Sequence, residues 1–207
     1  MAILQAGYEL IPCALEHLTG AAGDARGVAE GLAHDFPDAA FEVDRDVERY
    51  WDDLKRATAF TITLPRRETQ HCKTVPGLWI DQPSSSLFKA FARGDRHVHT
   101  EGWQFLVVRT APDRVILSVP PDAGLSLKGI ADALEEAEVA ARKRLATPRL
   151  GQPRPGFDEP DPWYDGRSPL HDFTIVDAPY SGTVLCDVEF LAVLRNIGNL
   201  SEVDFTP

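Results

Sequence analysis

The chain has 207 residues, of which 43% are hydrophobic and 26% are charged, a composition that supports a folded domain with a buried core. Its formal net charge is -11, from 21 basic and 32 acidic residues, which argues against a nucleic-acid-binding protein because such proteins present basic surfaces. The apolar runs are too short to span a membrane, and the three widely spaced cysteines form neither a disulfide framework nor a CxxC metal pair, so we expect a cytoplasmic protein.

The first elements have weak signals. Residues 7–14 are mostly apolar and predict a first strand. Residues 15–36 contain four glycines, each of which disfavours a helix interior, so a short or broken helix is expected there. The sequence DAAFEV, residues 38–43, predicts a second short strand.

Clearer periodicity follows. Residues 44–58 place apolar side chains at three- and four-residue spacing, as on one face of a helix. In residues 60–64, FTITL, apolar residues alternate with threonines, which is typical of a strand with one buried face. Residues 66–83 are predicted to be irregular, and residues 84–94 predict a helix with its first residue, a serine, as the cap.

A hairpin and a long helix come next. Residues 103–109 and 114–119 are apolar runs on either side of the turn sequence TAPD, which predicts a β-hairpin near the centre of a sheet. Residues 126–146 have the apolar stripe of a helix, on which Glu138 can pair with Arg142 one turn later.

The C-terminal part begins with a segment that cannot be helix or central strand. Residues 147–160 contain four prolines, so they are predicted to form an extended linker or a strap across the surface. Residues 172–177, DFTIVD, then predict a short strand, residues 187–196 a final helix, and residues 199–207 a loose tail.

Together these elements predict an α+β fold, in which a mostly antiparallel sheet has helices packed on one face and carries a C-terminal strap, short strand and helix. The alternation of strands and helices near the N-terminus leaves a ferredoxin-like arrangement open. We expect a main α+β domain over residues 1–146, the proline-rich linker or strap over 147–160, and a C-terminal extension over 161–207 that docks on the main domain.

One group of residues has the composition of a metal site. His97, His99 and Glu101 alternate, so on a strand their side chains would point the same way. Two imidazoles and a carboxylate can hold zinc and leave a position open for water. The favoured interpretation is a solvated strand entry, because such short patterns also occur by chance.

Cys72 is a candidate nucleophile, with His71 or His97 as its base. A reactive cysteine needs a nearby cation or helix N-terminus to lower its pKa. Neighbouring residues on a strand point apart, so the favoured interpretation is an inert thiol.

The sequence DPWYDGR, residues 161–167, places two large aromatics in a loop. Trp163 and Tyr164 are interpreted as anchors that attach a thin C-terminal segment to the core or dock on a partner. Asp165 is expected to close a tight turn and Arg167 to pair with an acid. Binding of a sugar or a cation by these acids and aromatics is the alternative.

The longer stretch DPWYDGRSPLHDFTIVDAPYSGT, residues 161–183, resembles a C-terminal signature of actinobacterial CATRA proteins, the caspase and TPR-repeat associated proteins of bacterial conflict systems. In that signature DPWYDGR is followed by a histidine, an aromatic residue, TIVD, a short turn and GT, and then by an acidic helix. His171 and the TIVD and GT residues of this chain match it, and Cys186 stands where a serine cap would be more natural.

The resemblance implies a non-catalytic interaction or regulatory component of a conflict system, which binds a caspase-like protease or a TPR protein encoded nearby. The chain has no phosphate-binding loop, dinucleotide fingerprint or GxSxG elbow, so no cofactor is predicted. Two alternatives stay open: a metal-dependent hydrolase that uses His97, His99 and Glu101, and an acidic immunity or inhibitor protein that mimics a polyanion.

Overall fold

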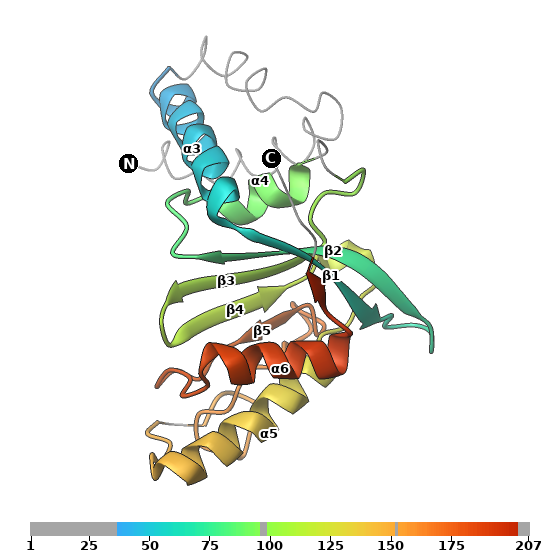
Figure 1. Cartoon of the computed structure of the whole chain (residues 1–207), viewed down its shortest axis with the longest axis vertical. Coiled ribbons are helices and arrows are strands. Elements are labelled where there is room, and N and C mark those ends of the chain that lie inside the picture. Colours follow the sequence, from blue (N-terminus) through green and yellow to red (C-terminus); the bar gives the residue numbers. More distant parts are fainter. Residues whose placement is uncertain (1–36, 96–98, 152, 203–207) are drawn as a thin grey trace. The chain divides into compact units, whose positions relative to one another are not determined.

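The computed structural model describes residues 37–95, 99–151 and 153–202 (Figure 1). These residues belong to two compact units. The first contains the described residues up to Ala57 together with those between Pro83 and Trp103, and the second contains Thr58 to Gln82 and the described residues from Gln104 onward.

The first unit contains a long helix, α3 (Pro37–Arg56). The helix predicted from residue 44 is confirmed, but it begins earlier, so the strand predicted over residues 38–43 is wrong. A proline suits the first turn of a helix, where no hydrogen bond needs its missing N–H, and the alanines and glutamate of DAAFEV favour helix. The strand predicted over 7–14 and the helix predicted over 15–36 lie outside the described residues.

The second helix of this unit, α4 (Phe88–Gly94), packs against α3 through aromatic rings. The centroid of the Tyr50 ring lies 5.5 Å from those of Phe88 and Phe91. The helix predicted over residues 84–94 is therefore present, but it begins four residues later than expected, and Ser84 does not cap it. The Ser84 hydroxyl donates instead to the Asp53 carboxylate on α3.

The second unit contains a six-stranded sheet in the order β5-β4-β3-β2-β1-β6. The strands are β1 (Thr58–Pro65), β2 (Cys72–Asp81), β3 (Phe105–Ala111), β4 (Arg114–Ser118), β5 (Ile175–Asp177) and β6 (Ser201–Glu202). Neighbouring strands are antiparallel except β2 and β3, which are parallel. The predicted α+β class with a mostly antiparallel sheet is confirmed, but the order is not ferredoxin-like, because the two parallel strands are direct neighbours.

Strand β2 corrects the prediction that residues 66–83 are irregular. The strand contains Pro76 and Gly77, which interrupt its apolar pattern and hide it from sequence analysis. Gly77 pairs with Phe60 on one side and with Phe105 on the other, and these two rings meet edge to face at 5.8 Å. A Cβ atom at Gly77 would lie 2.4 Å from the Phe60 ring, so the glycine makes room for this aromatic contact.

The hairpin of β3 and β4 is confirmed, with β3 beginning at Phe105. The predicted loose tail is wrong for its described part, because Ser201 and Glu202 form the edge strand β6 on β1. Residues 203–207 lie outside the described residues. A turn of 3₁₀ helix, η1 (Pro121–Ala123), follows β4.

Two helices of this unit, α5 (Lys128–Leu145) and α6 (Asp187–Gly198), pack against each other beside one face of the sheet (Figure 1). They share a core with alternate residues of the strands, among them Ile62, Leu64, Phe105, Val107 and Leu117. Alternate strand residues point to one face, so the predicted packing of helices on one face of the sheet is confirmed for this pair. Each fully buried side chain of this size contributes about 1.5–3 kcal/mol of transfer free energy.

The connector, residues 146–186, joins α5 to α6 and contains β5 but little other regular structure. The residues on both sides of the predicted linker, 147–160, belong to the same unit. The two compact units therefore divide the chain differently from the predicted main domain at 1–146 and extension at 161–207.

Candidate functional site

The connector has little strand pairing outside β5, where it forms the isolated bridges Pro153–Pro160 and Tyr164–Asp177. Single backbone hydrogen bonds, such as that from the Thr183 N–H to the Asp113 carbonyl, and buried polar side chains attach it to the rest of the unit. An irregular segment must satisfy its polar groups by other means when it is buried. The residues of the DPWYDGR sequence, together with their partners, show how this is done.

Trp163 is the apolar anchor of the connector. Its side chain is 1% exposed and belongs to the core, with its ring centroid 6.1 Å from that of Phe190 on α6. Its backbone N–H donates to Glu135 on α5 at 3.0 Å, and its indole Nε1–H donates to Glu138 at 3.3 Å. The connector is thus attached to both helices at this residue.

Glu138 is the centre of a buried polar network. It pairs with Arg142 as predicted, at 2.7 Å between Oε1 and Nε, but the pair is buried rather than on the helix surface. The same carboxylate accepts hydrogen bonds from the Thr183 hydroxyl at 2.6 Å and from the Val184 backbone N–H at 3.1 Å. The Arg142 guanidinium in turn donates to the Gly182 carbonyl at 2.6 Å. A buried ion pair is stable only when its remaining donors and acceptors are satisfied, and here the connector supplies them.

Asp161, the first residue of the DPWYDGR sequence, also holds part of the connector through hydrogen bonds. It is buried, has a positive φ of 43°, and accepts hydrogen bonds from the backbone N–H groups of Tyr180 at 2.6 Å and Ser181 at 2.7 Å. Burial raises the pKa of the Asp161 carboxyl, but the hydrogen bonds from Ser181 and Tyr180 and the Arg154 charge outweigh it and lower the pKa overall. The carboxylate therefore fixes the turn before α6.

Arg154 is a buried cation that sequence analysis did not identify. Its guanidinium carbon lies 4.0 Å from the Tyr180 ring centroid and 5.8 Å from that of Tyr164, and its Nη1 lies 3.5 Å from the Asp177 carboxylate. Tyr164 is therefore half-buried against Arg154 rather than part of the apolar core. Burial raises the pKa of Asp177, and the Arg154 charge partly offsets that effect.

Asp165 and Arg167 close a turn, as expected. Asp165 accepts from the backbone N–H of Arg167 at 3.1 Å and from its Nε at 3.0 Å. Hydrogen bonding to Asp165 raises the pKa of the Arg167 guanidinium. Arg167 also stacks on Phe157, with 3.6 Å from the guanidinium carbon to the ring centroid. Gly166 between them has φ +71°, and a Cβ atom there would lie 2.6 Å from the Ile175 carbonyl oxygen.

The predicted metal site is described only in part. His97 lies outside the described residues. His99 places its ring edge-on to Trp103, with centroids 4.8 Å apart, and burial lowers its pKa despite the Asp95 charge. Glu101 is exposed. In the described ranges no three His, Cys, Asp or Glu side chains gather closely enough to hold a metal ion.

The predicted nucleophile, Cys72, is exposed at the start of β2 and follows the exposed His71. Within the described part of the chain no hydrogen bond joins the Cys72 thiol to an imidazole.

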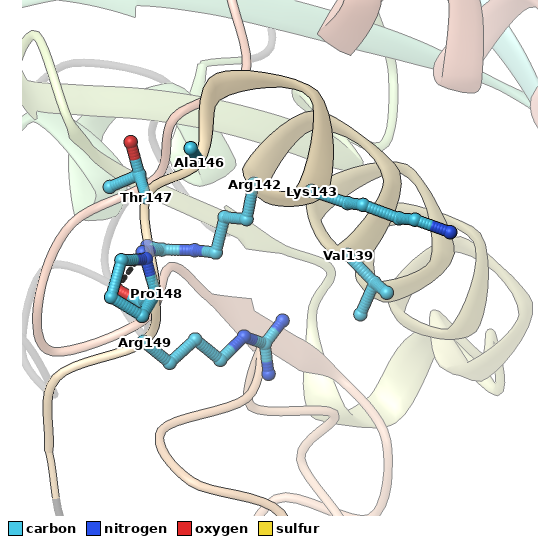
Figure 2. A pocket seen from close by; sticks show the side chains of 7 residues that line it. All are labelled: Val139, Arg142, Lys143, Ala146, Thr147, Pro148 and Arg149. Atoms are coloured by element: carbon cyan, nitrogen blue, oxygen red, sulfur yellow. Dashed lines mark hydrogen bonds between the residues drawn. The ribbon is translucent and has the colours of Figure 1, made fainter.

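A hollow of about 410 Å³ lies at the carboxyl end of α5 (Figure 2). It is lined by Val139, Arg142 and Lys143 of α5 and by the four residues 146–149 that follow the helix. Figure 2 shows the side chains of Lys143 and Arg149 on either side of Val139. Sequence analysis did not reveal this hollow, because it depends on how the chain turns back after α5.

No protein-family model, curated protein or solved structure matches this chain. Among the described residues, no helix combines the length and apolar character needed to cross a membrane.

Proposed function

We propose that the chain is a non-catalytic interaction or regulatory component of a bacterial conflict system, which acts by binding a protein partner such as a caspase-like protease or a TPR protein encoded nearby. The resemblance of residues 161–183 to the CATRA signature motivates this proposal. The observation that carries it is that this segment is fixed in place: Asp161 and Trp163 are buried and bind neighbouring parts of the fold, and the buried Asp165 closes the turn at Arg167.

This arrangement suits a binding platform better than a reaction centre. A catalytic site needs reactive groups that a substrate can reach, whereas buried carboxylates that accept several hydrogen bonds hold a chain segment in one path. The connector also carries exposed apolar side chains, with Leu170 84% and Tyr180 62% exposed. Apolar area held on a fixed segment is available for burial by a partner.

Co-expression of the tagged chain with each protein encoded beside its gene tests the proposal. We expect one neighbour to co-elute in a fixed ratio during affinity purification and size-exclusion chromatography, and the chain alone to turn over no peptide or ester substrate. An unrelated acidic protein of similar size and charge serves as the control for non-specific capture. Failure of every neighbour to co-elute, or turnover by the purified chain, contradicts the proposal.

The same sample separates this proposal from its alternatives. Bound metal that is lost in a His99→Ala variant would favour the metal-dependent hydrolase that uses His97, His99 and Glu101. Binding to a basic partner that disappears at high salt would favour the acidic immunity or inhibitor protein, because screening weakens interactions between exposed charges.

A further inference from the structure

The hollow at the carboxyl end of α5 combines apolar and basic side chains on a chain that is acidic overall (Figure 2). Val139 is a branched aliphatic residue of α5 that is 52% exposed, and Pro148 also lines the hollow. Leu150, which directly follows the lining residue Arg149, is 74% exposed. Exposed apolar side chains grouped in this way are typical of a binding surface.

The positive charges of the hollow differ in how far they are already neutralised. Arg142 is buried and paired with Glu138, and Arg149 donates to Glu135 at 2.8 Å. Lys143 is exposed, and no carboxylate among the described residues lies within ion-pair distance of its ammonium group. The Arg149 side chain is 11% exposed. Its hydrogen bonds to Glu135 and to the Pro160 carbonyl use only part of its guanidinium, so N–H groups remain for a ligand.

We propose that this hollow binds an acidic peptide segment of the protein partner. A carboxylate of the segment lies between the Lys143 ammonium and the Arg149 guanidinium, and an adjacent aliphatic side chain covers Val139 and Pro148. This inference rests on the proposed function as a partner-binding protein, and it names the surface and the chemistry of that binding.

The charge and the shape of the hollow favour a peptide over other ligands. A polyanion such as a nucleic acid would be repelled by the net charge of -11, whereas one carboxylate needs only the local pair of cations. The volume of about 410 Å³ suits one aliphatic side chain and one carboxylate. Glu135 holds the Arg149 side chain in place, so binding loses little side-chain freedom there.

Selection of peptides from a random dodecamer phage library on the immobilised full chain tests the proposal. We expect the enriched peptides to share an acidic residue next to an aliphatic one. Their dissociation constants, measured by fluorescence anisotropy with synthetic labelled peptides, should rise at least about tenfold for Val139→Asp and for Lys143→Glu. Both side chains are exposed and lie outside the polar networks of the connector, so both variants should fold normally.

Two matched variants elsewhere in the same unit control for general effects of charge. Ile197→Asp introduces the same charge at a similarly exposed aliphatic residue of α6, which is 48% exposed. Lys128→Glu reverses an exposed lysine at the opposite end of α5. Each control should change peptide affinity by less than about twofold.

Enriched peptides without a carboxylate, affinity that Val139→Asp and Lys143→Glu leave unchanged, or the absence of any enriched peptide would each overturn the proposal. A dimer of the chain in solution that Val139→Asp dissociates would also overturn it, because the surface would then belong to a second copy. The partner assay separates the two proposals. A neighbour that still co-elutes with the Val139→Asp variant rejects the hollow alone, whereas peptide binding without any partner rejects the proposed function alone.

Discussion

A helix in each unit uses buried or half-buried carboxylates to hold a segment that is remote in sequence. In the first unit, Asp46 and Asp53 of α3 accept hydrogen bonds from the stretch of residues 84–87 that precedes α4. In the second unit, Glu135 and Glu138 of α5 accept hydrogen bonds from the connector. Both helices therefore position a segment that has no regular structure of its own at the point of contact.

The two arrangements differ in the donors that they use. Asp46 and Asp53 are bound by hydroxyl and backbone N–H groups, and their arginine partners, Arg49 and Arg56, are partly exposed. Glu138 has a buried cation, Arg142, in addition to its neutral donors. Because an uncompensated charge is far more costly to bury than a neutral polar group, the second arrangement should be much less tolerant of change.

The largest effect is expected from Glu138→Ala. The change removes the acceptor of four hydrogen bonds and leaves the Arg142 charge buried without its partner, so the free energy of unfolding should fall by about 5 kcal/mol, the upper end for breaking a buried pair. Urea unfolding followed by circular dichroism measures this loss. The matched control is Glu136→Ala on the exposed side of the same helix, which should change stability by less than about 0.5 kcal/mol. Equal losses for the two variants would contradict the network.

The second largest effect is expected from Trp163→Ala, which should lower the free energy of unfolding by about 3–5 kcal/mol. The change leaves a cavity between α5 and α6 and removes a donor to Glu138. Amide hydrogen exchange should show that protection is lost first in the connector. Trp163→Phe keeps an aromatic ring in the core and should lose markedly less. A Trp163→Ala variant that is as stable as the parent chain would show that the indole does not anchor the connector.

Asp53→Asn tests the first unit and should lower the free energy of unfolding by less, about 1–3 kcal/mol. The amide keeps one acceptor oxygen but places its NH₂ group toward the donors of Ser84 and Ser85. Its neighbour Asp52 provides the control, because the Asp52 side chain is 73% exposed whereas that of Asp53 is 0% exposed. Asp52→Asn should leave thermal stability nearly unchanged. If Asp53→Asn cost as much as Glu138→Ala, the distinction between neutral and charged networks would fail.

The smallest effect concerns pH. Hydrogen bonds and nearby cations lower the pKa of Asp53 in the first unit and of Asp161 in the second, although burial alone would raise both. A carboxyl whose pKa is lower in the folded state adds stability above its unfolded pKa of about 3.9, and that stability is lost as the pH falls through the folded value. Unfolding curves between neutral and acid pH should therefore show a decline below about pH 4. The decline should be shallower in Asp161→Asn, whereas an unchanged slope would mean that Asp161 does not bind its proton more weakly in the folded state.

Elements with an uninterrupted local pattern were predictable from the sequence. Residues 44–56 of α3 and the helix α5 repeat apolar residues at helical spacing, the strand FTITL alternates apolar residues with threonines, and the hairpin of β3 and β4 joins two apolar runs by a turn sequence. Strand β2 was not predictable, because Pro76 and Gly77 break the alternation and the place of Gly77 is explained only by the rings of Phe60 and Phe105. The edge strand β6 exists because β1 offers free backbone groups, which its own short sequence does not reveal.

Polar contacts between near neighbours in sequence were also predictable, whereas contacts between remote residues were not. The pairing of Glu138 with Arg142 and the turn at Asp165 and Arg167 involve partners within four residues, so spacing alone predicts them. Arg154 contacts the rings of Tyr164 and Tyr180, which lie up to 26 positions away in the sequence, and no local sequence pattern indicates these contacts.

The sequence by itself determined the α+β class, the helix α5, the strand β1, the hairpin of β3 and β4 and the pairing of Glu138 with Arg142, because these depend on residue type and short-range spacing. Only the tertiary structure decided that Glu138 lies in the core, that Asp161 holds the turn before α6, and that Lys143 and Arg149 flank an apolar hollow. The path of the chain decides which side chains are buried and which remote side chains meet. Burial in turn sets the local dielectric constant, and therefore the interaction energy of each charge.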